Sequence, residues 1–208
     1  MGGQNVIPLS SGPSSRQVAA AAALPDAPIL MLVFVGFEAL MLLGLVGGFM
    51  LTRASGDVAW PPADHPWFAA EEIAILSATV LLSGLLTVLS GRAWKRRQAK
   101  AGPLLFAAIS LGIAFVVFHT TAWLTLVNQG VPLASTQPGG FFSLTMGLHN
   151  VTAIGAIGFM GVAWLRVSRL PEHEEVQRSM RGGTLSAARI LWYFVVGAWP
   201  VLYLCLYL

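Results

Sequence analysis

The chain has few charged residues and only one cysteine. Its 208 residues include 12 Lys or Arg and 9 Asp or Glu, so charged side chains make up 10% of the sequence, whereas 56% of the residues are hydrophobic. A soluble domain of this size needs a more polar surface than this composition supplies. The single cysteine, Cys205, excludes an intrachain disulfide and a cysteine-based metal centre. The composition therefore indicates an integral membrane protein.

Long polar connections are also lacking. No segment between the apolar runs is long enough to form a separate soluble domain, and no P-loop, dinucleotide-binding motif or hydrolase triad is found. These absences exclude the common nucleotide-binding and hydrolase classes.

Five apolar runs are long enough to cross a bilayer, which requires roughly 17 to 25 residues of helix. The predicted spans are residues 28–52, 69–90, 103–127, 141–166 and 186–208. We therefore predict an all-α transmembrane domain of five helices over residues 28–208. Residues 1–27 form a polar and Ala-rich tail, and the first run is too long for a cleaved signal peptide.

The basic residues predict the orientation of this bundle. If successive connections alternate sides, all but one of the 12 basic residues share a side with the N-terminus, and the exception is Arg53. The positive-inside rule then places the N-terminus in the cytoplasm and the C-terminus outside. The net charge of +3 thus reflects topology and gives no reason to expect a nucleic-acid partner.

Glu38 is the only charged residue deep inside an apolar run. It follows the start of its span by about ten residues, hence about 15 Å, which places it near the membrane midplane. A carboxylate there is costly unless it is protonated, paired or facing a polar cavity. One interpretation is a protonated acid that forms a hydrogen bond with a hydroxyl or carbonyl of a neighbouring helix. The other is a role in proton handling or lipid contact.

His119 and His149 are predicted to lie at similar depth on consecutive antiparallel helices. Two imidazoles so placed could ligate one haem iron from opposite faces, as in a membrane cytochrome b. They could equally join helices by hydrogen bonds, which is the more common role of polar side chains within bundles. Thr120, Thr121 and Asn150 lie beside them as hydrogen-bonding partners.

Small and aromatic residues give further packing signals. The second span carries a stripe of hydroxyl residues at helical spacing, namely Thr79, Ser83, Thr87 and Ser90. Glycines that could allow close helix contacts are Gly44 and Gly48, as a G-x-x-x-G pair, and Gly147, Gly155, Gly158 and Gly161. Trp60 and Trp67 are placed for the interfacial aromatic belt.

Read in order, these segments resemble subunit III of the haem-copper oxidases, the cytochrome c oxidase type, in a short five-helix form. The acid of FVGFEALMLLGLVGG precedes an outer W-P-P at Trp60, Pro61 and Pro62. FFSLTMGLHN is similar to the F-F-x-x-T-G-x-H segment of that family, with matches at Phe141, Phe142, Gly147 and His149. LWYFVVGAWPVLYLCLYL is similar to its closing segment, with matches at Trp192, Phe194, Val195, Trp199 and Tyr203.

The chain also departs from that pattern. Thr152 stands where the family has a second histidine, and Ala122 stands where it has an acid before Trp123. Tyr193 and Val196 replace a histidine and an aspartate of the last helix. Glu38 is retained, and the resemblance implies that it lines a lipid-filled cleft and is associated with proton uptake. The chain resembles a diverged member of the family.

The resemblance implies an accessory role. It implies a non-catalytic component of a respiratory terminal oxidase in the inner (plasma) membrane of a prokaryote, which stabilises the catalytic subunit and supports proton uptake during oxygen reduction. The partners would be catalytic subunit I, other oxidase subunits and membrane lipids, including a structural phospholipid. Haem and copper would reside in the partner, and this chain would bind no redox centre or metal. The alternatives are a cytochrome b that uses His119 and His149, or a subunit of a nitric-oxide-reductase relative.

Overall fold

The computed structural model of the protein describes residues 27–56, 59–61, 69–131, 133, 135–168 and 175–207, of which residues 70 and 175–181 are described by their backbone alone. Its helices are α2 (Ala27–Ala54), α3 (Ala70–Lys95), α4 (Ala101–Asn128), α5 (Gln137–Ser168) and α6 (Glu175–Leu206). All five are long and apolar enough to cross a membrane. The predicted all-α architecture with five spans is therefore confirmed, whereas the tail over residues 1–26 lies outside the described residues.

The helix ends differ from the predicted spans because hydropathy reports only the most apolar part of each helix. α5 begins four residues before the predicted Phe141, at Gln137. Here the hydroxyl of Thr136 accepts a hydrogen bond from the backbone N–H of Gly139 at 3.2 Å, which caps the first turn. α6 begins at Glu175, well before the apolar run that starts at residue 186, and α3 continues to Lys95 rather than residue 90.

Two helices end in tight left-handed turns. At the end of α3, Arg97 has φ of 54°, and the N–H of Gln98 bonds back to the carbonyl of Ala93 at 2.9 Å. At the end of α4, Gly130 has φ of 78°, and the N–H of Val131 bonds to the carbonyl of Leu126 at 3.1 Å. Both are Schellman-type ends, which satisfy carbonyls that the helix leaves free. They allow short reversals and therefore antiparallel neighbours.

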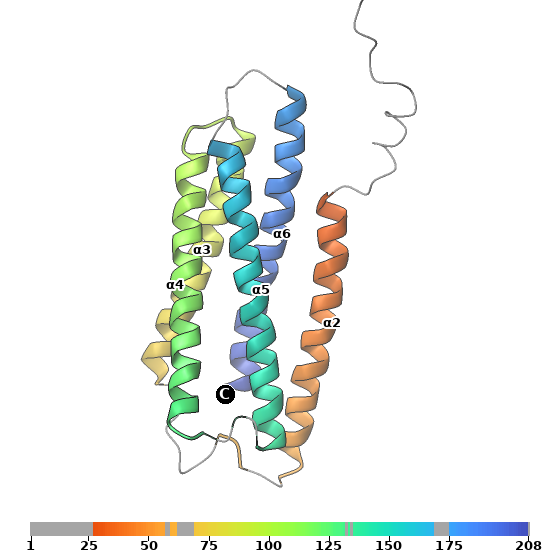
Figure 1. Ribbon diagram of the computed structural model, residues 1–208, viewed down its shortest axis with the longest axis vertical. Helices are drawn as coiled ribbons and strands as arrows, with labels where there is room; N and C mark the ends of the chain where they lie inside the picture. The colour runs from red at the N-terminus through yellow and green to blue at the C-terminus, as the bar shows by residue number, and fades with distance from the viewer. Residues whose placement is uncertain are drawn as a thin grey trace, which may run out of the picture.

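Four of the helices form a closed ring, and α2 packs outside it. α3 contacts α4, α4 contacts α5, α5 contacts α6, and α6 returns to α3. α2 contacts only α5 and α6, and it runs along their side of the bundle (Figure 1). Successive helices run in alternating directions, so the ends of α3 and α5 and the starts of α4 and α6 lie at one end of the molecule (Figure 1).

Part of the hydroxyl stripe of α3 lies at a helix contact. The Ser83 hydroxyl donates to the carbonyl of Ala108 at 2.7 Å, and the Ser90 hydroxyl donates to the carbonyl of Ala101 at 2.8 Å. Both bonds join α3 to α4. Thr79 and Thr87 instead donate to carbonyls of α3 itself.

The prediction of close glycine contacts is wrong for most of the residues named. A Cβ built at Gly48 would lie 2.5 Å from the ring of Phe141, so this glycine does allow a close approach. A Cβ built at Gly44, the other glycine of the G-x-x-x-G pair, would have no neighbour within 4 Å. The same is true of the glycines of α5 named above, which are Gly147, Gly155, Gly158 and Gly161. The sequence pattern alone could not separate glycines at a contact from glycines on an open face.

Candidate functional site

Glu38 lies on the narrow face by which α2 packs against the other helices. The only fully buried residues of α2 are Glu38, Leu42 and Phe49, which share one face of the helix because they are spaced four and seven residues apart. Most of the remaining surface of α2 is apolar and exposed, as at Val33 and Leu40. The carboxyl group is therefore inside the protein and not on the membrane-facing side, with only 4% of the residue exposed.

A hydroxyl from a neighbouring helix meets this acid. The Thr152 hydroxyl of α5 donates a hydrogen bond to Oε1 of Glu38. A threonine hydroxyl can donate to a carboxylate or accept from a protonated carboxyl group. The same contact can therefore persist in both protonation states of Glu38.

Thr152 is the contact of Glu38 that the sequence reasoning missed. The sequence singled it out only as the position where the related family has a histidine. The signal that could have found it is its place on α5, three residues after His149 and therefore on nearly the same face of the helix.

His119 and His149 meet inside the ring, at the contact of α4 and α5 with α6. Their ring centroids are 6.4 Å apart, and both side chains are buried. His149 Nε2 lies 3.1 Å from the carbonyl oxygen of Val195. A carbonyl can only accept, so this nitrogen carries the proton and the bond joins α5 to α6. Nδ1 of His149 and both ring nitrogens of His119 have no partner among the described residues.

Aromatic rings surround the histidine pair. Phe115 stacks on His119 with centroids 5.6 Å apart, and Trp199 lies 5.3 Å from His119 and 5.9 Å from His149. A haem held by two histidines needs both imidazoles to turn a nitrogen to one iron with a macrocycle between them. Because Nε2 of His149 is engaged and these rings occupy the surroundings, the residues present do not fit a haem.

The polar residues beside the imidazoles also form hydrogen bonds. Asn150 Nδ2 donates to the hydroxyl of Thr120 at 2.8 Å, which joins α5 to α4, and Thr121 donates to the carbonyl of Val117 in its own helix. The bond from Asn150 is therefore of the helix-joining kind that the hydrogen-bonding interpretation predicts. Among the described residues, no group of three or more His, Cys, Asp or Glu side chains could hold a metal ion.

Trp60 is a core residue, and its predicted place in the aromatic belt is wrong. Only 7% of the residue is exposed, and its ring packs 6.2 Å from Phe49 of α2 and 5.5 Å from Phe142 of α5. Pro61, joined to it by a cis peptide bond, is exposed. Pro62 and Trp67 lie outside the described residues.

The matched residues of the last helix hold α6 against α3. Trp192 Nε1 donates to the hydroxyl of Ser83 at 3.1 Å, and Trp199 Nε1 donates to the hydroxyl of Ser77 at 2.9 Å. Phe194 is half-buried. Tyr193 accepts a hydrogen bond from Nη2 of Arg189 at 2.8 Å. Two of the matched positions of α6, Trp192 and Trp199, therefore have a packing role that these contacts explain.

Comparisons with known proteins give distant matches to one kind of protein. No family model matches the chain. It is 28% identical to cytochrome c oxidase subunit 3 of Paracentrotus lividus over 72% of this chain and 55% of that protein. It is 26% identical to the subunit 3 of Trichophyton rubrum over 84% of this chain and 64% of that protein. The corresponding match to Corynebacterium diphtheriae is also 26%, over 85% of this chain and 84% of the relative.

The matches are distant, but they agree with one another and cover most of this chain. The chain spans between about half and two thirds of the length of the first two relatives. Together with the five membrane-length helices, these matches confirm the resemblance to cytochrome c oxidase subunit 3 that the sequence motifs indicated.

Proposed function

We propose that this chain is a non-catalytic component of a haem-copper terminal oxidase. It stabilises the catalytic subunit and supports proton uptake during oxygen reduction, while haem and copper reside in that partner. The observation that carries the proposal is the consistent similarity to cytochrome c oxidase subunit 3 over most of the chain. The crowded surroundings of the histidine pair disfavour the cytochrome b alternative.

The orientation and location of the chain belong to the same proposal. The N-terminus and the α3–α4 and α5–α6 connections lie in the cytoplasm, because these segments carry nearly all basic residues. The membrane is the inner (plasma) membrane of a prokaryote. The apolar outer surface of the helices is suited to lipid and to the spans of other subunits.

Glu38 is the residue to which we assign proton handling. It is a carboxyl group buried near the middle of a span, where an unpaired charge is costly. Its hydroxyl partner on α5 can serve both protonation states. A group of this kind can take up and release a proton without losing its contact with the neighbouring helix.

Replacing Glu38 with glutamine tests this assignment. Glu38→Gln keeps the size and hydrogen bonding of the side chain but removes the titratable group, so assembly with the oxidase should be retained. We expect a lower rate of oxygen consumption, less proton pumping per electron, or faster inactivation during turnover. The measurements are oxygen-electrode rates and proton release by the purified complex in vesicles.

The matched control is Glu71→Gln, which neutralises an exposed acid in the first turn of α3. It should leave rate, pumping and inactivation as in the unmodified complex. If Glu38→Gln behaves like this control in all three measurements, the assigned role of Glu38 is wrong.

A further inference from the structure

The histidine pair of α4 and α5 contains buried polar atoms that the described side chains do not bond. His119 and His149 are 2% and 0% exposed. Nδ1 of His149, both ring nitrogens of His119 and Oδ1 of Asn150 have no hydrogen-bond partner among the described residues. Buried polar atoms are in most cases bonded to the protein or to an ordered water molecule. This cluster therefore needs a partner that supplies hydrogen bonds.

The bond from His149 to α6 fixes what this partner has to offer. Nε2 of His149 donates to the carbonyl of Val195, so Nδ1 of the same uncharged ring is an acceptor. Oδ1 of Asn150 is also an acceptor, and the bond from Nδ2 to the Thr120 hydroxyl orients this amide. The uncharged ring of His119 has one donor and one acceptor nitrogen. The partner must therefore donate at least two hydrogen bonds and accept one.

The side chains of the cluster lie close together without satisfying one another. The rings of His119 and His149 have centroids 6.4 Å apart and planes at 74°. Asn150 lies near enough to His119 to polarise its ring, but the geometry of a direct hydrogen bond is not reached. A direct bond requires a donor and an acceptor within about 3.2 Å, whereas one small molecule between them suits atoms roughly 4 to 5 Å apart. The centroid distance of the two rings allows the second arrangement.

The helix that faces the pair is interrupted at the same level. Pro200 lies inside α6, where it has no N–H for the carbonyl of Val196 and its ring disturbs that turn. The same turn carries Trp199, whose ring centroid is 5.9 Å from that of His149. Val195, which accepts the bond from His149, directly precedes it. Water is one of the groups that insert where the helical hydrogen-bond ladder is broken.

We propose that one water molecule is bound at the histidine pair, between α4, α5 and α6. It donates to Nδ1 of His149 and to Oδ1 of Asn150, and it accepts from the ring N–H of His119. A buried water needs two to four polar partners, and this site offers three. The water joins α4 to α5 where their side chains do not bond directly. This assignment does not depend on the proposed oxidase partner.

Water suits this site better than a metal ion does. The rings of Phe115 and Trp199, which flank the pair, carry no negative charge to balance a cation. Among the described residues, no third His, Cys, Asp or Glu joins the two imidazoles. A metal ion would therefore keep its charge in an apolar surrounding with two uncharged ligands, which is costly.

A density map of the full chain, at a resolution that shows ordered water, tests the proposal. A peak should lie about 2.7 to 3.2 Å from Nδ1 of His149 and from Oδ1 of Asn150. His119→Phe keeps a ring against Phe115 but removes both nitrogens, so the peak should be lost in this variant.

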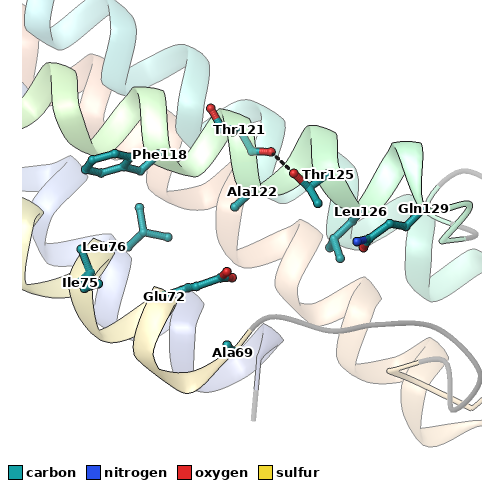
Figure 2. Close-up of a pocket in the computed structure, with 10 residues that line it drawn as sticks. All are labelled: Ala69, Glu72, Ile75, Leu76, Phe118, Thr121, Ala122, Thr125, Leu126 and Gln129. Atoms are coloured by element: carbon teal, nitrogen blue, oxygen red, sulfur yellow. Dashed lines mark hydrogen bonds between the residues drawn. The ribbon is translucent and has the colours of Figure 1, made fainter.

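Thr121→Val is the matched control for this map. Thr121 lines a pocket between α3 and α4 (Figure 2), and its hydroxyl donates to the carbonyl of Val117 in its own helix. The peak at the histidine pair should therefore remain in this variant. The proposal is overturned by the absence of a peak in the unmodified chain, by a peak that persists in His119→Phe, or by a contact of about 2.0 to 2.1 Å that marks a metal ion.

Nitrogen-15 NMR of the histidine-labelled chain in lipid bilayers gives a second test, without any substitution at the site. The sequence contains four histidines, so His65→Gln and His173→Gln leave only the pair labelled. Nδ1 of His149 should appear as an unprotonated nitrogen that receives magnetisation from water protons. No transfer from water to either ring would contradict the proposal. A coupling between a nitrogen of His119 and one of His149 would contradict it as well, because it marks a direct N–H···N bond.

Discussion

At the residue scale, two of the closest helix contacts depend on glycines that no sequence motif marks. A Cβ at Gly112 of α4 would lie 2.9 Å from the ring of Trp192 and 3.3 Å from Ile157, and a Cβ at Gly84 of α3 would lie 2.8 Å from Val196. These contacts join α4 to α5 and α6, and α3 to α6. They place small residues exactly where large side chains of the opposite helix need room.

We expect Gly112→Ala to destabilise the bundle by about 1 to 3 kcal/mol, because the added methyl group overpacks a buried contact with a large, immobile ring. Gly158→Ala is the matched control, since a Cβ there has no neighbour within 4 Å. It should be neutral or stabilise by up to about 1 kcal/mol through helix propensity. Thermal unfolding in detergent compares the two variants, and equal midpoints would contradict this description of the packing.

The position of Glu38 could be predicted from the sequence, whereas its partner could not. A charged residue inside an apolar run is visible without any structure, and its burial follows from the cost of exposing it to lipid. Its contact with Thr152 depends on the register between α2 and α5, which are separated by two other helices in the sequence. The bond from His149 to the carbonyl of Val195 could not be predicted either, because the sequence contains no pattern that marks which backbone carbonyl will accept a hydrogen bond.

At the element scale, the sequence predicts where helices cross the membrane but not where they end or which of them touch. The apolar runs reveal all five helices. The polar first turns of α6 and the capped start of α5 carry no hydropathy signal and were missed. The closed ring of α3 to α6, with α2 outside it, arises from inter-helix packing that periodicity does not encode.

The proposed direction of the helices can be tested with cysteine labelling. In a Cys205→Ser background, Lys95→Cys places a thiol at the end of α3, and Ser135→Cys places one in the α4–α5 connection. A maleimide that cannot cross the membrane should label position 135 in intact cells and position 95 only after the membrane is opened. The reverse pattern would show that the bundle is inserted in the opposite direction.

At the scale of the whole molecule, the protein is a scaffold of packed helices, and Glu38 is the one buried acid among the side chains that the structure describes. Its core is built from aromatic and aliphatic side chains, and most of the buried polar side chains join helices to one another. Much of the exposed surface of the helices is apolar, as expected for spans that face lipid or other subunits. This organisation, with the similarity to cytochrome c oxidase subunit 3, supports an accessory role beside a catalytic partner.

The most direct test is purification of the affinity-tagged chain from its native membranes, followed by native mass spectrometry and visible spectroscopy. The account predicts a stoichiometric complex with a haem-copper catalytic subunit, in which the haem signal belongs to that subunit. It also predicts that the chain produced alone has no reduced-minus-oxidised haem band. A chain that purifies without such a subunit, or that alone shows a haem band abolished by His119→Ala, would contradict the account.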